Sequence, residues 1–457
     1  MAAVRARLRA LSLFARCSAV RITLARRPSV PFTVIRRPAL RSTLSRRAAA
    51  VLCAAPLLLA ANAGPEGGLQ RVSIDPAATR DVWSRLPAPR GGSPEARLLG
   101  VYRLIGEGRS REALTAAEAL VRDVPTFQLA QLVYGDLLMS RRSPLPAFGG
   151  GVAELGGNTP EQLEHLRKEA SLRLQALLEM PPEGAVPRQF VELPATTRHA
   201  IAVDASRARL YLFERTEAGM RLAASHYVSL GRLGIGKSVE GDQRTPLGIY
   251  YITSRLDDRQ VADFYGPGAL PLNYPNEHDR RLGRTGSGIW LHGVPSESYS
   301  RAPLATDGCV VMSNDDLRRL IATVSPRTTP VVIASRLEWV TAPQAELDRR
   351  AALALVESWR EAVSSADLQR LESFYSPRFL GSNGSSSTWR KRLAQRTHAG
   401  VRPTLLKDVS VLASHDDGEV LVVTFGEIAK GERRGLTKRQ YWGKEGGQWK
   451  IFYEGVI

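Results

Sequence analysis

A cysteine and a histidine in the second half of this chain have the side chains and the neighbours that nucleophilic acyl transfer requires. His292 closes the run Gly-Ile-Trp-Leu-His over 288–292, and Cys309 follows seventeen positions later in the run Thr-Asp-Gly-Cys over 306–309. A thiol is a poor nucleophile until it is ionised, and a neighbouring imidazole can take its proton and later return it to a leaving amine. The two residues need only to be close in space.

Glycines flank both residues, because Gly293 directly follows His292 and Gly308 directly precedes Cys309. Glycine allows the backbone to turn sharply and to approach a ligand closely, so backbone amides there could receive the oxyanion of a tetrahedral intermediate. The alternative is that Cys309 is a small buried hydrophobic side chain and His292 a hydrogen-bonded strand residue. The flanking glycines favour the catalytic interpretation.

The stretch resembles the YkuD-type L,D-transpeptidase catalytic domain, whose motif is a His-Gly pair followed by a Ser/Thr-x-Gly-Cys turn. The likeness covers about residues 195–337, an ordinary domain length. It includes a second, upstream signature, which consists of Gly236-Lys237, Gly241-Asp242, Thr245-Pro246, Gly248 and Tyr250.

The resemblance implies a role for each residue of the motif. Cys309 is the nucleophile, His292 is the base, and the carbonyl of Gly293 orients the imidazole. The amides around Gly308 and Cys309 receive the oxyanion, and Thr306 supports the turn. No cofactor and no metal are implied, since the seven histidines are scattered and lack paired ligand spacing.

Two positions depart from the family pattern. Many members carry His where this chain has Asp307, and Arg where it has Val311. The missing arginine removes an anchor for a substrate carboxylate, which leaves the donor specificity open. A subgroup of the family, some of it hydrolytic, has a comparably apolar stretch after the cysteine.

The resemblance implies attack on peptidoglycan stem peptides, at the bond between the L-centre of meso-diaminopimelate and a D-amino acid. The acyl group then passes to an amine acceptor, whose identity the sequence leaves open. The product is a 3-3 cross-link, a lipoprotein attachment or an exchanged D-amino acid. With water as the acceptor, the same site is a carboxypeptidase or amidase. The alternative from another class is a catalytically silent wall-binding scaffold.

The elements around these residues predict an α+β multidomain chain, since helical and strand-rich windows occupy separate stretches. Apolar residues recur every three or four positions from Leu98 to Val121, which predicts a helix pair of the tetratricopeptide kind. Further helices are expected near 126–139 and over 160–180. An isolated pair is too short for a solenoid, so we expect a small helical cap or a surface for a protein partner.

Strand patterns begin at Arg198 and continue to Ala334, which predicts a mostly-β catalytic domain. A long amphipathic helix from about Ala342 to Ala366 and four strand-like runs follow, and this part resembles the NTF2-like cone fold. We therefore expect a leader over 1–63, a linker over 64–92, a helical region over 93–190, the catalytic domain over 191–338 and the NTF2-like domain over 339–457.

Charge and targeting signals indicate the cell envelope. The net charge is +18, but residues 1–63 hold twelve arginines and no Lys, Asp or Glu, which leaves 51 basic against 45 acidic residues beyond them. The positive charge, which was the main argument for a nucleic-acid partner, thus lies mostly in the leader.

Residues 44–63 have a basic start, a short apolar run and Ala61-Asn62-Ala63 as a cleavage site, which predicts an export signal and a periplasmic protein. An uncleaved inner-membrane anchor is the alternative. Cleavage would remove Cys17 and Cys53 and leave Cys309 as the single thiol.

Two further patterns have structural explanations. The run from Gly231 to Ser238 matches the phosphate-loop pattern GxxxxGK[ST], but Gly241, Pro246 and Gly248 exclude the helix that such a loop must open. We interpret it as turns between strands. The tryptophans of the last domain are expected in its core rather than in a ligand pocket, and they are Trp359, Trp389, Trp442 and Trp449.

Overall fold

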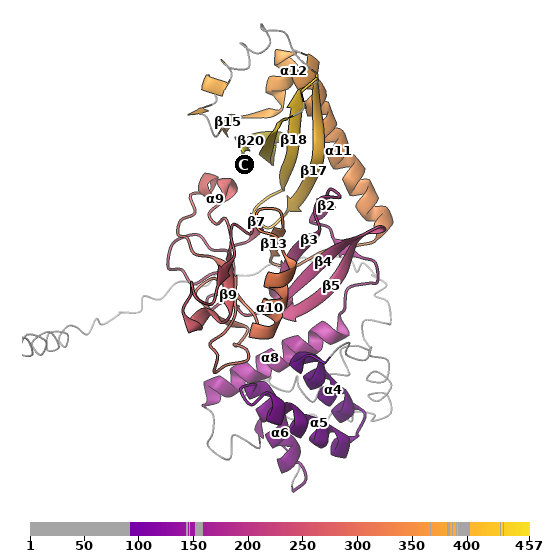
Figure 1. Cartoon of the computed structure of the whole chain (residues 1–457), viewed down its shortest axis with the longest axis vertical. Helices are drawn as coiled ribbons and strands as arrows, with labels where there is room; N and C mark the ends of the chain where they lie inside the picture. The colour runs from indigo at the N-terminus through magenta and orange to yellow at the C-terminus, as the bar shows by residue number, and fades with distance from the viewer. Residues whose placement is uncertain are drawn as a thin grey trace, which may run out of the picture. The chain divides into compact units, whose positions relative to one another are not determined.

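The structure of the chain is a computed structural model (Figure 1). It describes residues 92–457 except 143–144, 146, 151–158, 366, 382–383, 386, 390, 392–402, 430 and 433. The predicted leader, the export signal and all of the linker except Gly92 lie outside the described residues. Within the described residues, no helix combines the length and the apolar character needed to cross a bilayer.

The first described region is helical, as the apolar spacing predicts. Ser93 caps the first helix, and Thr159 forms a reciprocal capping box with Gln162 at the start of the last. Apolar side chains from all four helices share one core, with Leu98, Leu120 and Leu129 fully buried. The helices are α4 (Pro94–Gly106), α5 (Ser110–Asp123), α6 (Gln128–Met139) and α8 (Pro160–Leu178).

A five-stranded sheet is the centre of the next region, with the order β5-β4-β3-β13-β7. Only the β3–β13 pair is parallel. Alternate residues supply two different cores, so Ile201 and Val203 face one core while Ala200 and Ala202 face the other. Both faces of this sheet are therefore covered. The strands are β3 (His199–Asp204), β4 (Arg209–Thr216), β5 (Gly219–Tyr227), β7 (Gly248–Tyr251) and β13 (Pro330–Ala334).

A four-stranded sheet with the order β12-β10-β9-β8 packs with the helix α10 (Asn314–Thr323) on the first of these cores. Its strands are β8 (Leu256–Asp257), β9 (Gly268–Pro271), β10 (Trp290–His292) and β12 (Val310–Val311). Smaller elements complete the region. They are β1 (Val186–Pro187) paired with β14 (Trp339–Val340), β6 (Leu230–Gly231) paired with β11 (Leu304–Thr306), the short helix α9 (Glu277–Arg281) and the 3-10 turns η1 (Ala205–Arg207) and η2 (Asp263–Tyr265).

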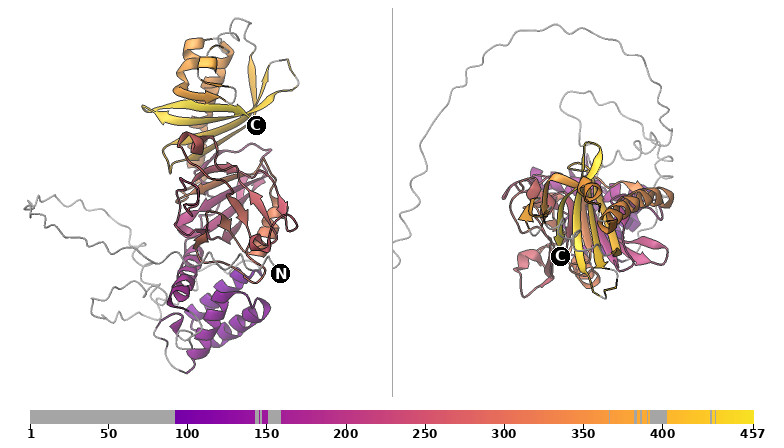
Figure 2. Two further views of the ribbon diagram at one scale, coloured as in Figure 1. Left: turned by 90° about the vertical axis from the view of Figure 1, so that its left-hand side faces the viewer. Right: turned by 90° about the horizontal axis from the view of Figure 1, so that it is seen from above.

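The last region is a curved sheet with two helices, α11 (Ala342–Ser365) and α12 (Leu368–Ser373), as Figure 2 shows. Trp359 and Trp442 are buried in the core between α11 and the sheet, and Trp389 and Trp449 pack against that core, so the core interpretation is confirmed. The strands are β15 (Tyr375–Gly381), β16 (Gly384–Ser385), β17 (Thr404–Ser414), β18 (Val420–Ala429), β19 (Leu436–Glu445) and β20 (Gln448–Val456).

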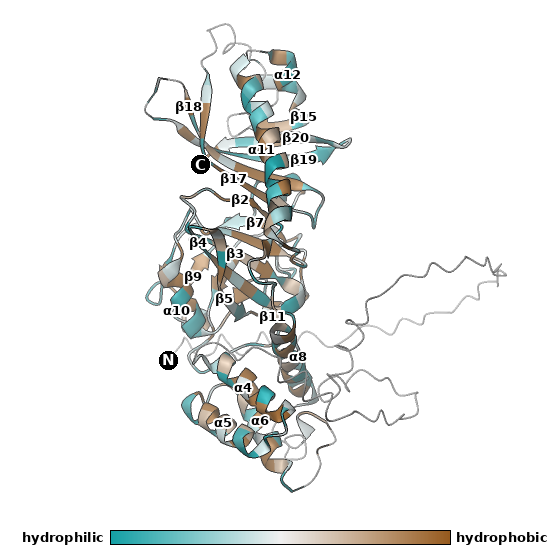
Figure 3. Ribbon diagram, turned by 90° about the vertical axis from the view of Figure 1, so that its right-hand side faces the viewer, coloured by the Kyte–Doolittle hydropathy of each residue, from teal (hydrophilic) through white to brown (hydrophobic). Residues whose placement is uncertain are grey.

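The opposite face of the curved sheet shares the second core of the five-stranded sheet. Phe213 of β4 packs there with Leu412 of β17 and Tyr441 of β19. The strand β2 (Phe190–Glu192), which precedes the five-stranded sheet in the chain, adds to the edge of β17. Apolar positions along these strands show as brown bands in Figure 3. The α+β multidomain architecture predicted from the sequence is confirmed.

This shared core predicts a large cost for removing Phe213, which is fully buried and lies edge-on to Phe190 at 5.3 Å between ring centroids. We expect Phe213→Ala to lower the free energy of unfolding by about 3–5 kcal/mol, because it creates a cavity. Leu347→Ala, at a side chain that is 60% exposed on α11, is the control and should change it by less than about 0.5 kcal/mol. Denaturant titration measures both. Equal effects of the two substitutions would contradict a shared core.

Candidate active site

Parallel pairing of β10 with β12 brings the predicted nucleophile and base onto neighbouring strands. Leu291 pairs with Val310 and His292 with Val311, and the amide of Met312 donates to the carbonyl of His292 at 3.0 Å. Cys309 directly precedes β12. The sixteen residues between them form the connection, and in this register Cys309 is level with Trp290, two residues before His292.

His292 is held in one tautomer. Its Nδ1 lies 2.8 Å from the carbonyl oxygen of Gly293, which can only accept, so Nδ1 carries the proton and Nε2 is left to accept one. The side chain is 2% exposed and lies edge-on to the Tyr265 ring at 4.9 Å between centroids. Burial, assisted by the charge of Arg301, lowers the pKa of His292 to about 4. The imidazole is therefore neutral at pH 7.

Gly293 is fixed by its neighbours. Its amide donates to the carbonyl of Tyr265 at 2.9 Å, and Asn314 Oδ1 accepts from the amide of Val294 at 2.8 Å. A Cβ on Gly293 would collide with that Asn314 oxygen. Only glycine fits here, because the Asn314 oxygen lies so close. The same contact fixes the position of the Gly293 carbonyl, which orients His292.

The turn before Cys309 depends on Gly308 and Thr306. Gly308 has a φ of +123°, and a Cβ there would meet the carbonyl oxygen of Arg244 at 2.7 Å. The hydroxyl of Thr306 accepts from the Gly308 amide at 3.1 Å and donates to the Cys309 carbonyl at 2.8 Å. Thr306 thus has the supporting position that was expected. Because the Gly308 amide already has this partner, the Cys309 amide is the remaining candidate of the two for an oxyanion.

Cys309 is partly exposed, and its Sγ lies 3.4 Å from the carbonyl oxygen of Gly288. Burial raises the pKa of the thiol above its ordinary value, while a hydrogen bond from the Trp290 backbone and the charge of Arg301 oppose that rise. The thiol and the imidazole are therefore both neutral at rest. Any attack by this thiol on a substrate would require the loss of its proton.

The two departures from the family pattern have different surroundings. Asp307 is exposed and forms an ion pair with Arg232 at 3.0 Å. Val311 is buried in β12 and exchanges backbone hydrogen bonds with Ser229. The Val311 side chain is thus buried and presents no charge to a ligand.

The upstream signature builds the turn that supports the Gly308 backbone. Lys237 is buried and donates to the Asp242 carboxylate at 2.9 Å, and the amides of Ser238 and Arg244 donate to the same carboxylate. Although burial opposes it, these bonds hold the pKa of Asp242 at about 2. No helix follows within residues 238–247, all of which the structure describes, so the phosphate-loop interpretation is excluded as predicted.

Sequence reasoning missed the residues that line the base. Phe264 and Tyr265 lie on η2, and their ring centroids are 6.0 and 4.9 Å from that of His292. Arg301 lies over the Phe264 ring, with 4.4 Å from its guanidinium carbon to the centroid. No local motif marks these positions, because the loop that carries η2 reaches the site only through the pairing of β9 with β10.

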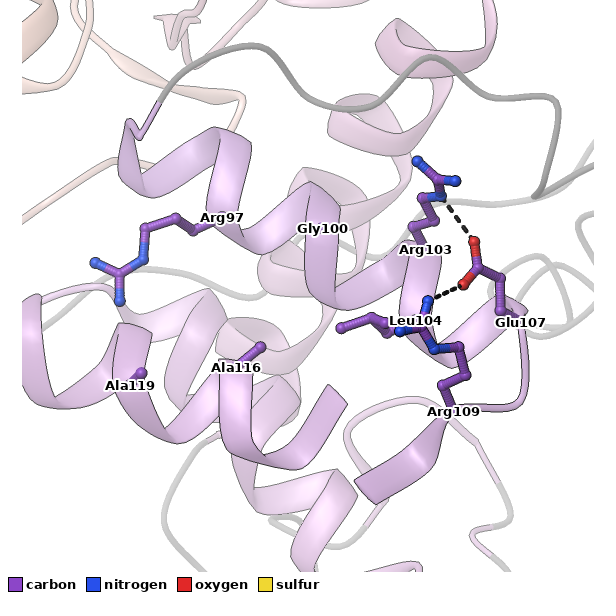
Figure 4. Close-up of a pocket in the computed structure, with 8 residues that line it drawn as sticks. All are labelled: Arg97, Gly100, Arg103, Leu104, Glu107, Arg109, Ala116 and Ala119. Atoms are coloured by element: carbon purple, nitrogen blue, oxygen red, sulfur yellow. Dashed lines mark hydrogen bonds and ion pairs between the residues drawn. The ribbon is translucent and has the colours of Figure 1, made fainter. Parts of the chain in front are cut away.

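A surface pocket elsewhere has no comparable chemistry. It lies between α4 and α5, where Glu107 is paired with Arg103 at 2.7 Å and with Arg109 at 2.8 Å (Figure 4). The remaining lining residues offer no nucleophile and no general base, and they are Arg97, Gly100, Leu104, Ala116 and Ala119.

Comparison with known proteins identifies the domain that carries the site. The model of the L,D-transpeptidase catalytic domain, YkuD, matches residues 198–333. A comparison with curated protein sequences gave no match. The chain therefore carries a catalytic domain of this type, which indicates an enzyme of the L,D-transpeptidase family and implies a peptidoglycan substrate.

Solved structures similar to this chain include Bd1075 of Bdellovibrio bacteriovorus, which is 25% identical, with a TM-score of 0.53 over 60% of this chain and 99% of that one. The helical cell shape determining protein Pgp2 of Campylobacter jejuni is 20% identical, with a TM-score of 0.48 over 64% and 99%. An NTF2-like protein of unknown function from Pseudomonas putida is 17% identical, with a TM-score of 0.21 over 25% and 87%.

The lowered pKa of His292 predicts an unusual acid limit of activity. A base must be unprotonated, and this imidazole keeps its neutral form down to about pH 4 instead of the ordinary value of 6.5. The acid limb of kcat/KM should therefore have its midpoint near pH 4, measured on stem peptides across the pH range. A midpoint near 6.5 would show that the working imidazole is not the buried one described here.

Proposed function

We propose that this protein is a cysteine-dependent L,D-transpeptidase that acts on peptidoglycan stem peptides in the cell envelope. The observation that carries the proposal is the hydrogen bond of 2.8 Å from His292 to the Gly293 carbonyl, on the strand next to Cys309. It leaves Nε2 of His292 as a base on the side of the imidazole away from Gly293. The predicted export signal supports the location, which remains a prediction.

Acylation begins when a stem peptide places the carbonyl of its L-centre at Cys309. His292 Nε2 takes the thiol proton as Sγ attacks the carbonyl carbon, and the amide of Cys309 donates to the developing oxyanion. The carbon–nitrogen bond then breaks. His292 returns the proton to the leaving amine, which departs as a D-amino acid, and the acyl group remains on Cys309 as a thioester.

Deacylation reverses these roles with a second nucleophile. An amine attacks the thioester, His292 takes its proton, and the thiol is regenerated when that proton passes to Sγ. The new amide is the transferase product. Water in place of the amine gives a carboxypeptidase, and the apolar Val310-Val311-Met312 stretch, which resembles a partly hydrolytic subgroup, favours this second candidate. Products formed from defined muropeptides, with and without an added amine, distinguish the two reactions.

Loss of either residue should have a distinct effect on turnover. Cys309→Ala should abolish it and keep the fold, because it deletes the nucleophile and little volume. His292→Ala should slow acylation by roughly a hundred- to ten-thousandfold, the usual contribution of a general base. The measurement is product formation from muropeptides, with thermal unfolding as the control for folding. Wild-type rates in the folded Cys309→Ala protein would contradict the cysteine mechanism, whereas no turnover by the folded wild-type protein would favour the non-catalytic scaffold.

A carbapenem should acylate the protein once, because its strained carbonyl reacts with an activated thiol next to an oxyanion site. After cleavage of the predicted signal, Cys309 is the single cysteine left. Intact mass should show one adduct per chain, absent from Cys309→Ala and formed more slowly in His292→Ala. An adduct that persists in Cys309→Ala would place the reactive group elsewhere.

A further inference from the structure

Arg301 occupies a particular position beside the candidate base. Its guanidinium lies over the ring of Phe264 at 4.4 Å, and the ring of Phe264 lies 6.0 Å from that of His292. Its Nη2 lies 3.5 Å from the carbonyl oxygen of Phe264. Phe264 itself is 49% exposed, so this cation and its aromatic support are at the surface of the site rather than in the core.

The charge of Arg301 has no acidic partner within the described part of the chain. The nearby carboxylate of Asp307 is already paired with Arg232, and Asp263 accepts from the amide of Ser296. Partial burial of Arg301 lowers the pKa of its guanidinium, which is the cost of holding this charge away from water. A carboxylate ligand would remove that cost, because the planar donors of arginine match a carboxylate geometrically.

The backbone around Arg301 is fixed, although its side chain has no ion pair. The hydroxyl of Tyr227 donates to the carbonyl of Arg301 at 3.0 Å, and the amide of Leu230 donates to the carbonyl of Pro303 at 2.8 Å. The guanidinium is therefore presented from a rigid segment, which is what a specificity-determining contact requires.

The helical region holds the same loop from its other side. Ser300 donates to the carboxylate of Glu169 on α8 at 2.9 Å, and the Tyr299 ring lies 4.1 Å from that of Phe127. Glu169 is in turn paired with the buried Arg173 at 2.8 Å. The residues adjacent to Arg301 thus contact both the strands β5 and β6 and the helical region.

We propose that Arg301 binds the α-carboxylate of the D-amino acid that leaves the stem peptide. This inference rests on the proposed function. In that reaction the leaving nitrogen must come within hydrogen-bond reach of His292, and the carboxylate of the leaving amino acid is attached to the carbon next to that nitrogen. The guanidinium of Arg301 and the imidazole of His292 both lie near the ring of Phe264. The cation is therefore on the side of the site where this carboxylate must lie.

The test compares two peptides in the non-reacting Cys309→Ala protein. One is a stem tetrapeptide with a free terminal carboxylate, and the other is its terminal carboxamide. We expect Arg301→Gln to weaken binding of the carboxylate peptide by roughly ten- to a hundredfold, the range for a hydrogen bond to a charged group, and to leave the carboxamide unaffected. Arg301→Lys should recover part of the loss. Calorimetry measures the dissociation constants of both peptides for each protein.

Arg232→Gln is the matched control, because Arg232 is a neighbouring arginine that is half exposed and already paired with Asp307. It should leave the ratio of the two affinities unchanged. Three results would overturn the inference. Arg301→Gln could weaken the binding of both peptides equally, the protein with Arg301 could bind the two peptides with equal affinity, or one of the peptides could fail to bind that protein. The assay does not need turnover. If peptide binding depends on Arg301 but the protein with Cys309 shows no activity, only the proposed reaction is contradicted, and the inference about Arg301 stands.

Discussion

The parallel pairing of β10 with β12 is the constraint on which the site depends. In this register Leu291 pairs with Val310 and His292 with Val311, which places Cys309 level with Trp290, two residues before His292 on the neighbouring strand. A parallel pair requires the chain to leave the sheet and return through a connecting loop. That loop carries Arg301, and its course is fixed by hydrogen bonds to β5, β6 and α8. The candidate nucleophile, the candidate base and the cation proposed to bind the substrate therefore all lie on this strand pair or on the loop that connects it.

Electrostatics give the pair its chemical character. Burial favours the neutral form of both groups, since it lowers the pKa of His292 to about 4 and raises that of Cys309. A thiolate–imidazolium ion pair is thus disfavoured before a substrate binds. The Gly293 carbonyl selects the tautomer whose free nitrogen can accept the thiol proton. In the proposed reaction the proton moves as the carbon–sulfur bond forms, because burial disfavours a thiolate in the resting state.

Much of this architecture could be predicted from the sequence, because the signals are local. Period-three and period-four apolar spacing gave the four helices, and the strand patterns around Asp204 and Pro330 correspond to β3, β4 and β13. The glycines beside His292 and Cys309 indicated close backbone approach, and the structure shows their contacts with Asn314 and Arg244. The roles of these residues in catalysis remain predictions.

Features that depend on tertiary contacts could not be predicted. Nothing near Phe264 in the sequence signals a ring beside His292, and the unpaired state of Arg301 is visible only once Asp307 is seen with Arg232. The addition of β2 to the C-terminal sheet is equally non-local, since Phe190 and Leu412 pair across more than two hundred residues. The Gly308 amide, an expected oxyanion donor, proved to be engaged by Thr306.

The central claim is that a stem peptide becomes covalently attached to Cys309 during the reaction. The most direct measurement is rapid-quench mass spectrometry of the protein mixed with a tetrapeptide donor, followed by peptide mapping. The account predicts a transient adduct on Cys309 with the mass of the donor minus its terminal D-amino acid, removed by hydroxylamine as a thioester is. Steady product formation with Cys309 unmodified at every time point would contradict it.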